Sequence, residues 1–206
     1  MDQFEGENSN LEELVLPSGC RFNPTNSELV VYYLKRKIMG EPLPVHVIPT
    51  VDVYACNPER LPFSLFKHGK PHEWFFFSNR RKGKILTEGG YFDLSSSARE
   101  AVYERSTGPT GSRKTSELVG FLRRLDFYNG RPPAGTKSKW TIEEFRVNPS
   151  TVKVKNDDRS TKRKVSNLVV CKVINKEPPP KPEGWIEIPI TICESGQDKE
   201  SGVDKE

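Results

Sequence analysis

The chain has few of the residues that build metal centres and disulfide scaffolds. Its four cysteines, Cys20, Cys56, Cys171 and Cys193, stand far apart, and no CxxC pair or Cys/His cluster occurs among the 206 residues. This spacing argues against zinc fingers and disulfide-stapled folds, and scattered free thiols are typical of the reducing cytosol or nucleus. We therefore expect no metal and no cofactor.

Long apolar runs and enzyme motifs are also missing. No run approaches 18 apolar residues, and the N-terminus MDQFEGENSN lacks the basic start and apolar segment of a secretory signal. The sequence contains no GxSxG, no phosphate-cradling GxxxxGK and no metal-ligand spacing. We therefore expect no membrane segment, no small-molecule substrate and no enzymatic activity.

Positive charge is concentrated in the middle of the chain. Residues 1–14 hold five acids and no base, and residues 177–206 hold eight acids and three bases. Between Val15 and Lys176 there remain 29 bases and 15 acids, a net charge of +14. We divide the chain into an acidic flexible lead (1–14), a basic folded domain (15–176) and a Pro-rich, acidic tail (177–206). Such a domain predicts a polyanionic partner.

One early helix is indicated by its capping pattern. Thr25 is followed three residues later by Glu28, which is the spacing of a capping box. The helix is predicted from Leu29 to about Ile38, and Gly40 ends it.

Strand-like runs follow for the rest of the domain. Residues 73–78 (EWFFFS) carry aromatics on both faces, which predicts a central strand buried on both sides. Further strands are predicted at 140–147 and 168–174, whereas the charged stretch 153–164 is interpreted as a loop. The fold class is therefore α+β, with a twisted antiparallel β-sheet flanked by a few helices.

A basic hairpin is the most informative stretch of the sequence. Two runs, Val102–Thr107 and Leu118–Tyr128, flank a connector rich in Gly, Pro, Ser and Thr. Cations lie on both runs and on the connector between them. Such a hairpin can lie against a nucleic acid backbone or enter a groove. The other interpretation of this stretch alone is a hairpin with a solvated basic face.

The order of motifs resembles that of the plant NAC transcription factors. Leu16–Ile38 is similar to the family's LPPGFRFxPTDEELVxxYLxxK, and Glu73–Ser78 is similar to EWYFF. Val119–Gly135 resembles VGVKKALVFYxGKPPKG, and Leu168–Val173 resembles WVLCRIY. The resemblance covers roughly Leu16 to Lys176 in the family's order and spacing.

The resemblance implies a nuclear transcription factor that binds double-stranded DNA with a CGT-type core. It also implies a homodimer, or a heterodimer with related NAC proteins, formed through the N-terminal segment. In the family, an Arg and a Glu pair across the dimer at positions that match Arg21 and Glu28. The expected dimer residues are Leu16, Pro17, Arg21, Phe22 and Glu28.

The family's DNA-reading strand, GYWKATGTDK, finds its match at Val102–Gly111. Arg105 replaces the Lys there and is the expected reader of guanine, because an Arg can bond guanine O6 and N7 together. Glu104, however, stands where the family has Trp, and the following TDK is missing. The expected DNA contacts are Arg80, Arg81, Lys82, Arg105, Thr107, Arg113, Lys114, Arg123 and Arg124.

Two alternatives follow from these departures and from a second basic run. A module that dimerises with related factors, binds DNA weakly and regulates them by sequestration also fits the sequence. Separately, Lys162, Arg163 and Lys164 match a nuclear import signal. A solvated loop explains that run equally well.

Overall fold

The computed structural model describes residues 20–107, 114–154 and 158–176, with the backbone alone at 96–99, 105–107 and 114–115. The helical elements are α1 (Asn26–Glu28), η1 (Leu29–Lys35), α2 (Arg36–Met39), η2 (Pro58–Arg60), η3 (Phe63–Leu65), η4 (Pro149–Thr151) and α3 (Arg159–Asn167). The strands are β1 (Glu73–Asn79), β2 (Ile85–Leu86), β3 (Gly90–Thr107), β4 (Lys114–Asn129), β5 (Thr136–Val147) and β6 (Leu168–Asn175).

The predicted N-terminal helix is confirmed and is formed by α1, the π-helical η1 and α2 in succession. The Thr25 side chain accepts a hydrogen bond from the Glu28 backbone N–H, and the Glu28 carboxylate accepts one from the Thr25 N–H at 2.8 Å. This capping box satisfies backbone donors that a helix start otherwise leaves unpaired. Gly40 ends the helix in the left-handed conformation, with φ of 71°.

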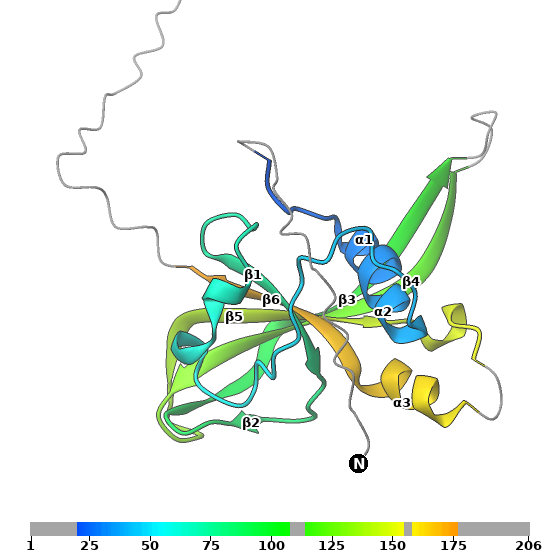
Figure 1. Ribbon diagram of the computed structural model, residues 1–206. Coiled ribbons are helices and arrows are strands. Elements are labelled where there is room, and N and C mark those ends of the chain that lie inside the picture. The colour runs from blue at the N-terminus through cyan, green and yellow to red at the C-terminus, as the bar shows by residue number, and fades with distance from the viewer. Residues whose placement is uncertain (1–19, 108–113, 155–157, 177–206) are drawn as a thin grey trace, which may run out of the picture.

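The six strands form one antiparallel sheet in the order β1-β6-β5-β4-β3-β2. Figure 1 shows that the paired ends of β3 and β4 project beyond the rest of the molecule as a two-stranded arm. The α+β fold with a twisted antiparallel sheet and few helices is therefore confirmed.

Strand β1 differs from its prediction because it lies at the edge of this sheet rather than in its centre. Its burial is as expected, since Phe75, Phe76, Phe77 and Ser78 are all buried. The free edge is covered by a short parallel bridge from Thr50 to Phe77. The aromatic side chains on both faces therefore predicted the burial of β1 correctly, but they did not predict how many strands lie beside it.

The two faces of β1 are covered by different parts of the chain. On the odd-numbered face, Phe22, which precedes the N-terminal helix, packs edge-on against Phe75 with ring centroids 5.2 Å apart. On the even-numbered face, the ring centroids of Phe63 in η3 and Trp74 are 4.1 Å apart. Because side chains alternate along a strand, the Phe22 segment and η3 cover opposite faces of β1, and Phe66, which follows η3, returns to the face of Phe75.

The interpretation of 153–164 as a loop is wrong, because α3 begins within it. Asp158 caps this helix by accepting a hydrogen bond from the Thr161 backbone N–H at 2.8 Å. Val165 packs against the core, while the helix cations face solvent. One apolar anchor and a side-chain cap are therefore enough to order a segment whose composition indicated a loop.

Asp126 is a buried carboxylate with three partners on β5 and at the end of β6. Thr141 donates a hydrogen bond to it at 2.8 Å, and the Lys137 and Lys176 ammonium groups lie at 2.6 and 3.8 Å. Burial alone would raise the pKa of Asp126, but the hydrogen bonds from Lys137 and Thr141 outweigh it and hold the pKa below its usual value.

The ionised form of Asp126 is therefore expected to stabilise the fold above about pH 4, the pKa of an unfolded aspartate. That contribution disappears as the pH falls through the lower folded pKa. Asp126→Asn should lose about 1–3 kcal/mol of unfolding free energy at pH 7. Urea titrations at several pH values should show that the difference in unfolding free energy between wild type and Asp126→Asn disappears at acidic pH. A difference that stays constant with pH would contradict this account.

Candidate nucleic-acid interface

The projecting β3–β4 arm carries the predicted base reader Arg105 and the predicted DNA contacts Thr107 and Lys114. Arg105 lies opposite Ser116 and Thr107 opposite Lys114 in the strand register. Arg113 lies outside the described residues. The arm joins the sheet as a long two-stranded extension (Figure 1), which is a shape that fits the major groove of DNA.

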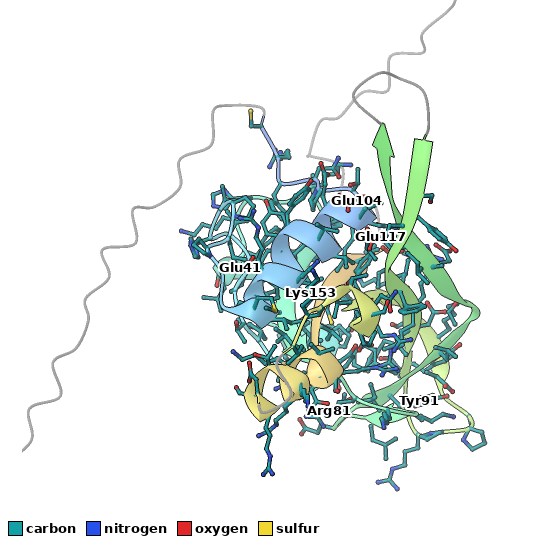
Figure 2. The ribbon with its side chains drawn as sticks, turned by 90° about the vertical axis from the view of Figure 1, so that its right-hand side faces the viewer. Glu41, Arg81, Tyr91, Glu104, Glu117 and Lys153 are labelled. Carbon is teal, nitrogen blue, oxygen red and sulfur yellow. The ribbon has the colours of Figure 1, made fainter. Side chains whose placement is uncertain are left out.

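The same arm carries an acidic pair that the sequence pattern did not reveal. Glu104 lies directly opposite Glu117 in the strand register, and Figure 2 shows both near α1. Like charges facing each other across two strands repel one another. The strand register was the missing information, because the two residues are distant in the sequence.

A basic loop follows β1 at one end of the sheet. Arg81 and Lys82 are exposed, and Arg81 forms an ion pair with the exposed Asp52 at 2.7 Å. An exposed pair of this kind is worth about 1 kcal/mol or less, so Arg81 can exchange Asp52 for another anion at little cost.

Arg123 is largely buried by its contacts, with a side chain only 13% exposed. Its Nε and Nη2 atoms donate to the two oxygens of Glu144 at 2.6 and 2.8 Å, and Nη2 also donates to the Arg81 carbonyl. Glu144 is only 1% exposed and also accepts a hydrogen bond from the Tyr54 hydroxyl at 2.7 Å. Arg123 therefore neutralises a buried carboxylate and supports the basic loop.

The sequence held a signal for this partnership. In the strand WTIEEFRV, Glu144 falls on the same face as the apolar Trp140 and Ile142, because strand side chains alternate. A carboxylate among core residues requires a cationic partner. Arg123 lies directly opposite Glu144 in the register of β4 and β5.

Arg124 has two acidic partners in the described part of the chain. Its Nε atom donates to Glu143 at 2.9 Å, and its Nη1 atom donates to Glu100. These hydrogen bonds raise the pKa of Arg124, the one that it donates to Glu100 most. The structure thus places Arg123 and Arg124 in ion pairs, and leaves Arg81 and Lys82 with the more exposed charges.

Arg80 lines two separate hollows on the surface of the protein. Its Nε atom is 3.5 Å from the Glu144 carboxylate. One hollow, of about 120 Å³, is lined by Arg80, Arg123 and Arg146, a third arginine that the sequence interpretation missed. The Arg146 guanidinium lies 4.2 Å from the centre of the Phe121 ring. The second hollow adjoins α3.

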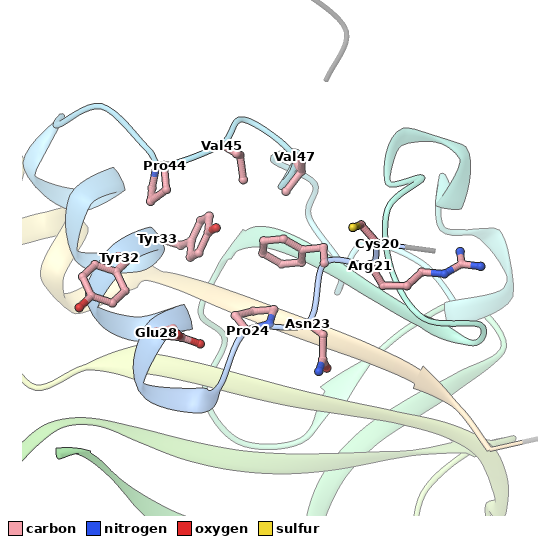
Figure 3. A pocket seen from close by; sticks show the side chains of 11 residues that line it. Cys20, Arg21, Asn23, Pro24, Glu28, Tyr32, Tyr33, Pro44, Val45 and Val47 are labelled. Carbon is pink, nitrogen blue, oxygen red and sulfur yellow. The ribbon is translucent and has the colours of Figure 1, made fainter. Parts of the chain in front are cut away.

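Three of the predicted dimer residues, Arg21, Phe22 and Glu28, line a separate hollow of about 350 Å³ (Figure 3). Arg21 and Glu28 both line it but lie on opposite sides of it, and within the described residues they form no ion pair with each other. Arg21 instead donates to the Gly69 carbonyl at 3.4 Å. Phe22 is buried in the protomer, and Leu16 and Pro17 lie outside the described residues.

Other predicted or excluded features can be placed briefly. Lys162, Arg163 and Lys164 are exposed on α3 rather than on a loop. Among residues 20–107, 114–154 and 158–176, no group of metal-binding side chains occurs. No helix in that same part of the chain is long and apolar enough to cross a membrane.

Comparisons with known proteins agree on one family. The family described as "No apical meristem (NAM) protein" matches residues 17–147. NAC transcription factor 29 of Arabidopsis thaliana is 37% identical over 164 residues, which are 78% of this chain and 57% of that protein. NAC transcription factor 25 of the same plant is 36% identical over 183 residues, 81% of this chain and 52% of that protein.

A rice relative is matched over a smaller share of its length. NAC domain-containing protein 54 of Oryza sativa subsp. japonica is 36% identical over 139 residues, 64% of this chain and 20% of that protein. The chain thus spans between a fifth and three fifths of the length of these relatives. Since the family match covers more than half of the chain, the protein belongs to the No apical meristem (NAM) protein family, the NAC transcription factors.

Proposed function

We propose that the protein regulates transcription in the nucleus as a dimer that binds double-stranded DNA with a basic edge of its sheet. The observation that carries this proposal is the exposed pair of cations Arg81 and Lys82 on a loop that Arg123 of β4 holds through the Arg81 carbonyl, while the other end of β4 forms the projecting arm, in a chain of the NAC family. Cations on a loop suit phosphates, and a two-stranded arm suits a groove.

Some of these cations contact the DNA, and others hold the contacting residues in place. Arg80, Arg81 and Lys82 contact phosphates, and Arg113 and Lys114 remain phosphate contacts expected from the sequence. Arg123 supports the loop from behind through the Arg81 carbonyl. Arg124 steadies the sheet through Glu143 and Glu100. Dimerisation uses the segment around Arg21 and Glu28, which are exposed and unpaired with each other within one described chain.

Arg105 is the first candidate for reading a base, and a different alignment of the same motif gives a second. Gly90-Tyr91-Phe92 opens β3 and matches the first residues of GYWKATGTDK, with Phe92 at the Trp position. Without gaps, this alignment brings Arg99 to the position of the final Lys. Between Leu94 and Arg99 the ladder with β4 is interrupted. Interruptions of this kind are frequent next to functional sites.

The sequestering dimerisation module remains a second candidate function. The observation in its favour is the facing pair Glu104 and Glu117 on the arm, because two carboxylates disfavour approach to phosphates. The two functions differ in one measurable property, which is the affinity of the whole protein for duplex DNA at physiological salt.

Replacing Arg81 and Lys82 together with alanine tests the proposed phosphate contacts. Each lost contact reduces the salt dependence by about 0.9 in the log–log slope, so we expect a decrease of about 1.8. Affinity should fall equally for a CGT-containing and a scrambled duplex, measured by fluorescence anisotropy. The matched control removes Lys70 and Arg131, two exposed cations outside the interface. An unchanged slope in the Arg81/Lys82 variant would remove the loop from the interface.

A further inference from the structure

A basic hollow of about 560 Å³ lies between the end of β1 and α3. Two backbone interactions fix its walls: the Arg80 N–H donates to the Asn167 carbonyl at 2.7 Å, and Asn79 pairs with Leu168 across β1 and β6. The last turn of α3 is therefore tied to the start of the basic loop. Residues distant in the sequence meet at this point.

Apart from Leu168, every residue of the lining has a side chain that can donate a hydrogen bond, and the lining contains no acid. Arg80, Arg163 and Lys164 supply three positive charges, and Ser160, Asn79 and Asn167 add a hydroxyl and two amides. Arg163 and Lys164 are exposed and form no ion pair with any residue of the described ranges. The Arg80 Nε atom is buried without a hydrogen-bond partner in the described structure, 3.5 Å from Glu144.

This inventory fits a phosphate group. A phosphate has several acceptor oxygens and a charge that two or more cations can share, and an Arg guanidinium can donate to it through two N–H groups. A single carboxylate would leave most of the donors in the lining unused. The hollow also continues directly into the basic loop, since Arg80 lines it and Arg81 follows beside α3 (Figure 2).

We propose that this hollow, the α3 phosphate site, binds a backbone phosphate of duplex DNA and extends the nucleic-acid interface from the arm to α3. The proposal rests on the proposed function for its ligand, but its geometry is independent of the arm. A linear import signal would use Lys162, Arg163 and Lys164 alone. This hollow is instead lined by Arg163 and Lys164 together with Arg80, which is distant in the sequence. Such a site forms only in the folded protein.

The test is the full-length variant Arg163→Ala with Lys164→Ala, compared with Lys70→Ala with Arg131→Ala. All four side chains are exposed, so both double variants should fold, which circular dichroism checks. Fluorescence anisotropy across a salt series should show a slope reduced by about 1.8 in the α3 variant only. At 100 mM salt this corresponds to up to about 60-fold weaker binding, equal for CGT-containing and scrambled duplexes.

Three further results separate the explanations. If the wild type binds duplex and both double variants keep its affinity and slope, the α3 phosphate site is refuted while the proposed function stands. If the α3 variant keeps its DNA binding but a fluorescent fusion of it no longer accumulates in the nucleus, α3 serves nuclear import and the α3 phosphate site is also refuted.

If the wild type binds no duplex, the proposed function fails, and the site is tested with inorganic phosphate. Chemical-shift changes at Arg80 and Ser160 that the α3 variant abolishes would then support it, and their absence would overturn it.

Discussion

Replacing Arg123 with alanine is expected to lower the free energy of unfolding by about 3–5 kcal/mol. The reason is that Glu144, which is 1% exposed, would lose both hydrogen bonds from the guanidinium and keep an uncompensated charge in the core. The Tyr54 hydroxyl and the Arg80 Nε at 3.5 Å cannot replace this neutralisation. Urea unfolding followed by tryptophan fluorescence measures the loss.

Arg124→Ala is the matched control, because the neighbouring arginine pairs with the more exposed Glu100 and Glu143. Its loss should be about 1 kcal/mol or less. The double variant Arg123→Met with Glu144→Leu should recover part of the stability, since it removes the buried charge together with its partner. Equal, small effects of Arg123→Ala and Arg124→Ala would show that Arg123 is a surface cation after all.

Phe22→Ala is expected to destabilise the protein by about 3–5 kcal/mol. Phe22 is 8% exposed and packs edge-on against three rings: Tyr33 at 5.2 Å, Phe66 at 5.8 Å and Phe75 at 5.2 Å. Edge-on aromatic pairs contribute beyond the area that they bury. The ring therefore fastens the N-terminal segment to the helix and to β1 within one protomer.

Tyr32→Ala provides the comparison, because Tyr32 is 41% exposed and lines the same hollow. Its effect on unfolding should stay within about 0.5 kcal/mol. Sedimentation at several concentrations then separates stability from association. If Phe22→Ala gives a monomer whose unfolding free energy is unchanged, the ring serves the dimer and not the core.

Local sequence signals predicted the helix and the aromatic strand, but long-range pairing decided the rest of the fold. The capping box at Thr25 and Glu28 and the run EWFFFS each specify an element through neighbouring residues. Strand β3 runs 18 residues, through Ser95, Ser96 and Ser97, which have little strand preference of their own. The ladder with β4 is interrupted at these serines, and pairing on both sides of them, at Gly90–Leu94 and Arg99–Thr107, keeps them within one strand.

The candidate site was predicted as a set of cations, and charge alone could not separate their roles. Arg81 and Arg123 have the same side chain, yet one faces the exposed Asp52 and the other the buried Glu144. The difference depends on strand register, which also brings Glu117 opposite Glu104. Arg80 and Arg163 meet only because β6 returns beside β1.

The most direct test of the central claim is sequence discrimination by the full-length protein. Binding to a duplex with a CGT-type core and to a scrambled duplex is measured by fluorescence anisotropy, with Arg105→Ala and Arg99→Ala in parallel. The account predicts tighter binding to the CGT duplex, with a preference that one of these variants removes. Each good bidentate contact to a base is worth about 1–3 kcal/mol of discrimination. No binding to either duplex near physiological salt would contradict the account and favour the sequestering dimerisation module.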